Sequence, residues 1–171
     1  MRGARGSPAD EPTLIAQAGP IAKALNSVFA EAGEAPTMGS KVQRLKLQKA
    51  VYLLKRLGYP SARRWSFGTY LNGPYSPELA KAYYALGDSG IRQAGGASDI
   101  PAATLRTVAD AIRKGPDFME ALATLLDGAS QYPNLPAALA WARDLKPQIP
   151  GSTWTEVRGF LTSHTDLIPR T

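Results

Sequence analysis

Apolar residues recur along most of the chain at the three- and four-residue spacing of amphipathic helices. The clearest case is residues 44–57, where Leu47, Val51 and Leu54 fall on one narrow arc and Gly58 provides a stop. The opposite arc carries Gln48, Lys49, Tyr52, Lys55 and Arg56, joined by Lys41 and Arg44 if the helix begins that early. The pattern therefore predicts a helix with one buried face and one basic, outward-facing face.

Similar spacing predicts further helices on both sides of this segment. Pro20 suits a first helical position, and a helix should run from there to Gly33. Ser76 followed by Pro77 is typical of an N-cap and the first residue of a helix, which should end near Leu86. The remaining predicted helices cover 101–114, 117–127 with a stop at Gly128, and 135–146 after an Asn134 cap. A Thr153-x-x-Glu156 capping box opens the final one.

One short segment has the character of a strand. Residues 65–71 alternate loosely and are rich in aromatic and β-branched side chains. Glycines at 87–97 predict a loop, and residues 1–12 have no apolar period, which predicts a disordered tail. We therefore expect a mainly α protein: a single compact helical domain over 13–171, with about six to seven helices and one short β element near residues 65–71.

Composition excludes several classes of function. The 171-residue chain has no Cys and a single His, His164. Disulfides, thiol catalysis, thiolate zinc sites and multi-histidine metal centres are therefore excluded, and the carboxylates lack paired-acid spacing. We expect neither an enzyme nor a metal or cofactor site. No apolar run approaches the ~20 residues that span a bilayer, and no signal-peptide pattern opens the chain, so we expect no membrane association and a cytoplasmic location.

Positive charge is concentrated in one segment. The net charge is +6, and residues 41–64 contain eight Lys and Arg side chains without one Asp or Glu. Like charges on neighbouring turns destabilise a helix slightly, so we interpret this face as a docking surface for nucleic-acid phosphate or for a carboxylate-rich protein. The structural alternative is a solvated face whose long side chains cover apolar surface.

A second candidate surface is the turn that follows the predicted strand. Tyr70 and Tyr75 flank the rigid Gly73-Pro74 pair, where aromatic rings could be presented at little entropic cost. Scaffolding is the structural alternative, and it explains the glycine and prolines but not the tyrosines. The two surfaces together give the candidate partner-binding residues Lys46, Lys49, Tyr52, Lys55, Arg56, Arg63, Arg64, Tyr70, Asn72 and Tyr75.

Two motifs stand in order within residues 44–86. The first is Lys46-Leu-Gln-Lys-Ala-Val-Tyr-Leu-Leu54, and the second is Tyr70-Leu-Asn-Gly-Pro-Tyr-Ser-Pro77. Together they resemble the SocA-like antitoxin family, also called the Panacea domain. Lys46, Leu47, Gln48 and Lys49 match its helix signature, and Gly73, Pro74 and Pro77 match its turn; of these, Leu47, Gln48, Gly73, Pro74 and Pro77 are taken as structural. The family usually has an apolar residue after Gly-Pro and apolar or aromatic residues at the positions of Lys55-Arg56, which suggests a divergent branch.

The resemblance implies a mainly helical prokaryotic or phage protein of a toxin–antitoxin system, without catalytic residues. We therefore expect a non-enzymatic protein-binding module that neutralises a toxin. The expected partner is that toxin, which should be acidic because the predicted face is basic. The alternative is a DNA-binding transcriptional regulator that uses the basic helix 44–57 to bind nucleic acid. The sequence predicts no oligomeric state.

Overall fold

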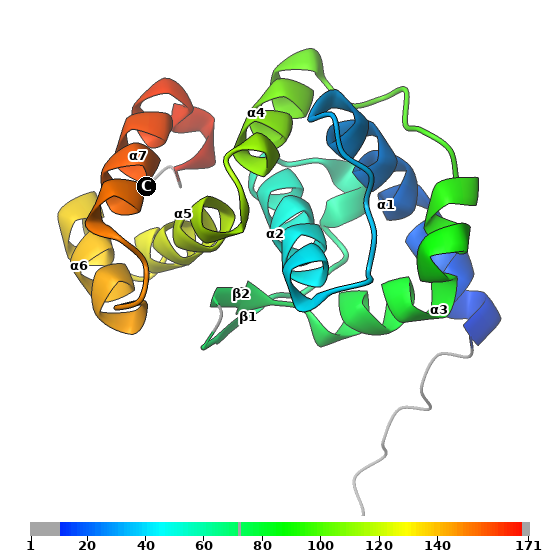
Figure 1. The fold of residues 1–171 in the computed structure, drawn as a ribbon, viewed down its shortest axis with the longest axis horizontal. Helices are drawn as coiled ribbons and strands as arrows, with labels where there is room; N and C mark the ends of the chain where they lie inside the picture. The colour runs from blue at the N-terminus through cyan, green and yellow to red at the C-terminus, as the bar shows by residue number, and fades with distance from the viewer. Residues whose placement is uncertain (1–10, 72, 169–171) are drawn as a thin grey trace, which may run out of the picture.

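The computed structural model describes residues 11–71 and 73–168, which form seven α-helices and a small two-stranded sheet at one edge of the helical body (Figure 1). The helices are α1 (Glu11–Glu31), α2 (Lys41–Arg56), α3 (Pro77–Gln93), α4 (Ala102–Arg113), α5 (Pro116–Ala129), α6 (Leu135–Leu145) and α7 (Gly151–Ser163). The 3-10 turns are η1 (Pro60–Ala62) and η2 (Thr165–Leu167). The expected mainly α class with one short β element is confirmed.

The β element is an antiparallel pair of short strands. Strand β1 (Gly68–Tyr70) pairs with β2 (Gly73–Tyr75), with Thr69 opposite Pro74. The prediction placed one strand over 65–71 and a turn over the glycine and proline that follow. In the structure these two residues belong to the second strand instead. Pro74 fits there because the sheet has only two strands, so its missing N–H removes no bond to a third strand.

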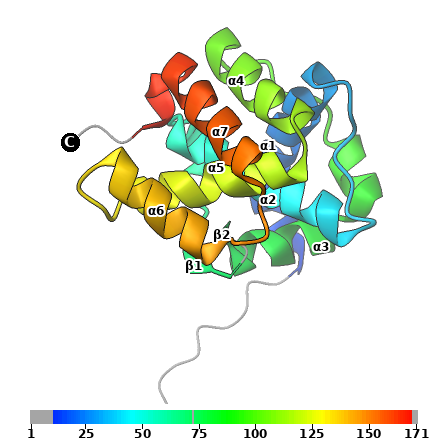
Figure 2. The same ribbon diagram turned by 60° about the vertical axis from the view of Figure 1, so that its left-hand side comes forward.

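Helix α2 occupies the centre of the fold. It contacts α1, α4, α5, η1 and β2, and residues 47–54 are all buried. A helix that is buried on every side is a core element rather than a surface element. Helix α5 lies on one side of α2 and carries α6 and α7 on its other side (Figures 1 and 2).

Helix α1 begins earlier than predicted. It starts at Glu11 and contains Pro20 in its interior, where the proline removes one backbone donor. Buried Ala18 and Ile21 on either side of the proline pack into the core, and this packing offsets the missing bond. The predicted tail is therefore wrong for residues 11–12, and residues 1–10 lie outside the described residues.

Helix α3 extends beyond its predicted end. Its N-cap is confirmed, since the Ser76 hydroxyl accepts a hydrogen bond from the Leu79 N–H at 3.2 Å. Gly87 then adopts φ +67°, which breaks the helical run close to the predicted end, but the chain continues helically to Gln93 instead of forming a loop. The buried Ile91 anchors this second stretch to the core.

The C-terminal helices follow the predicted order, with two corrections. Gly128 lies inside α5 rather than ending it, and a glycine is required there because an added Cβ would lie 2.6 Å from the Trp141 ring of α6. The predicted capping box is also wrong: α7 begins at Gly151, and Glu156 forms an ion pair with Lys114 at 2.7 Å. The Asn134 cap of α6 is confirmed, since its side chain accepts from the Ala137 N–H.

A continuous apolar core joins these elements, with buried side chains from every helix. Trp65 and Trp154 are buried in it, and Trp141 packs against it. Within residues 11–71 and 73–168, no helix combines the length and the apolar character that a membrane crossing requires.

Candidate functional site

The two sequence motifs meet where β2 leads into α3. Gln48 Nε2 donates to the Ser76 carbonyl at 2.9 Å, and Gln48 Oε1 accepts from the Ser76 N–H, also at 2.9 Å. Lys49 Nζ donates to the Pro74 carbonyl at 2.7 Å. Buried backbone groups need such partners. Gln48 and Lys49 are polar residues within an apolar stretch of α2, and their role there is to hold the Gly-Pro segment in place.

The expectation that Gln48, Lys49 and Tyr52 face outward is wrong. Gln48 and Lys49 are each 2% exposed, and Tyr52 is 6% exposed. The prediction assumed that α2 has a single buried face. In the structure, β2 and α5 also pack against α2, so its polar arc meets backbone groups of the protein instead of solvent.

Burial changes the acid–base behaviour of Lys49. Loss of hydration lowers its pKa to about 8, an effect partly opposed by the nearby Glu120 and increased by Lys146. Lys146 is itself fully buried and pairs with Glu120 at 2.8 Å. Two lysines and one glutamate thus share the interior where α2, α5 and the end of α6 meet.

Gly73 allows the hairpin to approach α5 closely. Its φ of +82° is a conformation that favours glycine, and an added Cβ would lie 2.6 Å from Thr124 Oγ1 and 3.3 Å from Lys49 Nζ. Thr124 is fully buried, and its hydroxyl has no hydrogen-bond partner among the residues that the structure describes. The structural role assigned to Gly73 from the sequence therefore has a steric cause.

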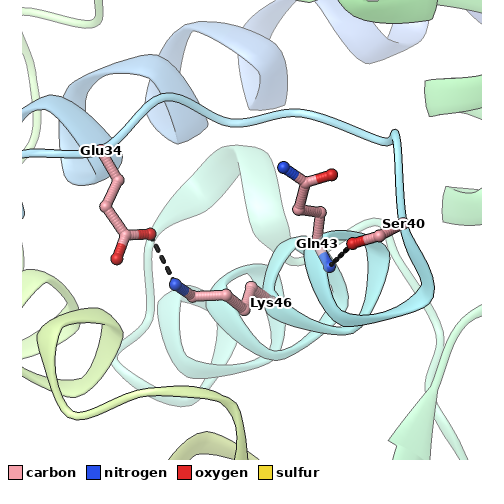
Figure 3. Close-up of polar contacts among 4 residues, drawn as sticks. All are labelled: Glu34, Ser40, Gln43 and Lys46. Carbon is pink, nitrogen blue, oxygen red and sulfur yellow. Dashed lines mark hydrogen bonds and ion pairs between the residues drawn. The ribbon is translucent and has the colours of Figure 1, made fainter.

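Lys46 forms an ion pair within the protein. The Ser40 hydroxyl caps α2 by accepting from the Gln43 N–H at 3.1 Å, and one turn further Lys46 Nζ reaches Glu34 at 2.5 Å (Figure 3). The Lys46 side chain is only 12% exposed. The loop between α1 and α2 thus supplies a carboxylate that the basic segment itself lacks.

Lys55 and Arg56, near the other end of α2, donate to neighbouring backbone. Lys55 Nζ reaches the Trp65 carbonyl at 2.6 Å, and Arg56 reaches the Leu167 carbonyl at 3.2 Å and Ser130 Oγ at 2.8 Å. Both side chains are half-buried. They tie the segment after η1 and the C-terminal turn η2 to the central helix.

A shallow cavity of about 520 Å³ lies beside these two cations. Its lining includes Tyr52, which packs edge-to-face on Phe67 at 5.3 Å, and the carboxylates of Asp127 and Asp166. Because acids and bases of this chain already face one another there, the cavity has no strong preference for an acidic partner.

Arg63 and Arg64 lie beyond the C-terminal end of α2, after η1. Both are exposed, and the Arg64 guanidinium lies over the Trp65 ring at 4.8 Å. The exposed Lys41 lies at the opposite end of α2, whose 16 residues give it a length of about 24 Å. The predicted single basic face is therefore wrong: the exposed cations are divided between two ends of the helix.

The predicted tyrosines remain accessible. Tyr70 is 49% exposed and meets the half-buried Tyr75 edge-to-face, with ring centroids 5.6 Å apart. Leu71 beside them is 82% exposed. The predicted site residue Asn72 lies outside the described residues.

A small pocket, which we call the tyrosine pocket, opens between the first half of α2, the end of β2 and α3. Its volume is about 130 Å³. The residues that line it are Lys41, Arg44, Leu45, Gln48, Lys49, Tyr75, Tyr83 and Tyr84. Three cations and three phenols thus face one space, and the lining contains no carboxylate.

Sequence reasoning missed half of this pocket. Lys41 and Arg44 were placed on the basic arc but not among the candidate site residues. Tyr83 is 3% exposed, whereas the adjacent Tyr84 is 58% exposed. Two successive tyrosines on a helix must point in different directions, so the pair itself indicated one ring inside and one at the surface.

Two further features of the described residues concern metal ligands and the single histidine. No group of three metal-ligating side chains occurs among the residues outside 1–10, 72 and 169–171. His164 stacks on Phe160 with ring centroids 4.1 Å apart, and its Nδ1 lies 2.9 Å from the Phe160 carbonyl. These contacts give the histidine a packing role at the end of α7.

The tyrosine pocket is where predicted and unpredicted residues come together. Lys49 and Tyr75 line it, whereas Lys55 and Arg56 lie by the other cavity and Arg63 and Arg64 lie beyond the helix.

No family model, curated protein or solved structure matches this chain.

Proposed function

We propose that this chain is a non-enzymatic protein-binding module of the toxin-neutralising antitoxin type, which docks an acidic protein partner at the tyrosine pocket. One observation carries the proposal: three tyrosines and three cations line a single pocket without any carboxylate. Tyr and Arg are enriched among the residues that dominate protein–protein binding energy. The excess of positive charge selects an acidic partner.

The rigidity of the pocket supports a binding role. Gln48 and Lys49 fix the backbone at Pro74 and Ser76, so the pocket floor is formed before a partner arrives. A surface that is already ordered loses less conformational entropy on binding. Two exposed rings extend the surface at the pocket: Tyr84, which lines it, and Tyr70, which packs on Tyr75.

The packing of α2 gives the DNA-binding alternative little support. A recognition helix must present successive side chains to the major groove. Residues 47–54 of α2 are buried, and the exposed Lys41 and Arg64 lie near its opposite ends. We therefore favour a protein partner over nucleic acid.

The proposal is tested by growth rescue. Each product encoded next to the gene for this chain is expressed alone and together with the chain. We expect one neighbour to arrest growth alone, and co-expression to restore growth through a complex that co-purifies at stoichiometric ratio. Lack of rescue with every toxic neighbour would contradict the antitoxin role. A DNA anisotropy titration would favour the regulator instead if the logarithm of the binding constant fell with the logarithm of salt concentration at a slope of about −4.

A further inference from the structure

The size of the tyrosine pocket limits what it can hold. Ligand and cofactor pockets occupy roughly 300–1,000 Å³. The tyrosine pocket measures about 130 Å³, which is close to the volume of four water molecules at roughly 30 Å³ each. It is therefore too small for a nucleotide or a drug-sized cofactor and suits one side chain of a partner.

The charged groups around the pocket are all cations, which donate hydrogen bonds and accept none, and its three phenol hydroxyls can donate as well as accept. Arg44 NH1 donates to the Met38 carbonyl at 2.9 Å, and its guanidinium carries further N–H donors. Lys41 is exposed at the mouth, and Lys49 lies at the floor. Burial raises the pKa of Tyr83, so its hydroxyl keeps its proton at neutral pH. A group that accepts several hydrogen bonds and carries negative charge complements this lining.

We propose that the tyrosine pocket receives a single carboxylate side chain, an Asp or Glu that apolar residues flank on the surface of the acidic protein partner. The proposal rests on the proposed protein-binding function and names the chemistry of its contact. Arg44 and Lys41 would hold the carboxylate from the mouth. The exposed Val42 and Tyr84 would contact apolar residues on either side of the acid.

The buried ammonium group of Lys49, which lines the pocket, supports a carboxylate as the ligand. Lys49 keeps a positive charge in an interior that penalises it, and its pKa is lowered to about 8. A carboxylate placed nearby would stabilise that charge. Binding of the acid would therefore raise the pKa of Lys49, and the affinity should decline when the pH rises above 8.

Nucleic-acid bases fit the pocket less well. Stacking on tyrosine requires an open ring face. Tyr83 is 3% exposed, and Tyr75 is half-buried with its ring packed edge-to-face on Tyr70. Tyr84 alone among the pocket tyrosines is largely exposed, and a single ring gives no platform for successive bases.

The test uses the full chain labelled with ¹⁵N and two capped heptapeptides. Both place one central residue between apolar residues, Glu in the first peptide and Gln in the second. We expect the Glu peptide to shift the amide signals of Tyr75, Tyr83 and Tyr84, and to bind about tenfold more tightly than the Gln peptide, because hydrogen bonds to a charged acceptor are roughly twice as strong. Equal binding of the two peptides would overturn the proposal.

Charge reversal locates the site. Lys41→Glu should weaken binding of the Glu peptide at least about fivefold, and Arg44→Glu should do the same. The matched control is Arg158→Glu, an equal change of charge at an exposed residue in the groove between α6 and α7, which should leave the affinity unchanged. Because Arg44 also holds the Met38 carbonyl, Lys41→Glu is the variant that keeps the test valid if Arg44→Glu misfolds.

The remaining outcomes separate this inference from the proposed function. If Arg158→Glu weakens binding as much as Lys41→Glu does, or if a single-stranded oligothymidine displaces the Glu peptide from the pocket, the carboxylate assignment is wrong. If growth rescue by a neighbour survives both pocket variants, the antitoxin role stands and the pocket assignment fails. If the Glu peptide binds as described but no neighbour is rescued, the pocket stands and the antitoxin role fails.

Discussion

The buried ammonium group of Lys49 predicts an unusual dependence of stability on pH. Its pKa is about 8 in the folded protein against 10.5 in the unfolded chain. Between these values the unfolded chain binds more protons than the folded protein, so the free energy of unfolding must rise with pH. Each unit of pKa difference corresponds to about 1.4 kcal/mol, and the gain from pH 7 to pH 9.5 comes to about 2 kcal/mol.

The tyrosines set the upper end of this window. Burial raises the pKa of Tyr59 to about 12, and that of Tyr52 is raised further. Unfolded tyrosines begin to lose protons near their ordinary pKa of about 10, while these two stay protonated in the folded protein. Their contribution therefore lowers stability as the pH rises through 10, and pH 7 to 9.5 is the range in which Lys49 dominates.

Urea unfolding followed by tryptophan fluorescence at several pH values in this range measures the effect. The Lys49→Met variant should lose the rise in stability. Lys55→Met is the matched control, because Lys55 also lies on α2 and also donates to a carbonyl, at 2.6 Å, yet is only half-buried. A wild-type stability that falls from pH 7 to 9.5, or a rise that persists in Lys49→Met, would refute the reasoning.

Three further substitutions test the joint between α2 and the hairpin by urea unfolding. Gly73→Ala should lower the free energy of unfolding by about 3 kcal/mol, because a Cβ at φ +82° is strained and would also meet Thr124. Gly95→Ala is the control: its φ is +76° but the space around it is open, so the loss should be only about 1–2 kcal/mol. Equal losses in the two variants would exclude the steric cause. Gln48→Leu should cost about 2–4 kcal/mol by leaving a buried N–H and C=O unpaired, and the exposed Gln43→Leu should be nearly neutral. Thr124→Val should raise stability by about 1 kcal/mol, since the hydroxyl is buried without a described partner, and a loss of stability would show that the hydroxyl is bonded.

Local sequence rules predicted the helix order and several boundaries correctly. The Ser76 and Asn134 caps depend on contacts within three residues, so they can be recognised without knowledge of the fold. The rules for helix ends were wrong at Pro20 and Gly128, which both lie inside a helix. At both positions distant packing decided the outcome, as when Trp141 lies against the face that Gly128 leaves open.

The orientation of α2 could not be obtained from its own pattern. A helical wheel separates Leu47 and Leu54 from Lys49, but it does not reveal that a hairpin and α5 cover the polar side. The bonds that explain the polar residues span 25 and 28 positions along the chain, from Lys49 to Pro74 and from Gln48 to Ser76. The two motifs were recognised separately, and their contact emerges only in three dimensions.

The use of cations as structural donors changes which residues meet a partner but not the charge that attracts it. Lys55 and Arg56 donate to neutral carbonyls, so these bonds bring no negative charge to the two side chains. Residues 41–64 contain no Asp or Glu, and within this segment Lys46 pairs with the carboxylate of Glu34. The segment therefore remains strongly positive over the Debye length of about 8 Å at physiological salt. The whole segment therefore attracts an acidic partner. Direct contacts with the partner depend on the few cations that still have accessible donors, and two of these, Lys41 and Arg44, line the tyrosine pocket.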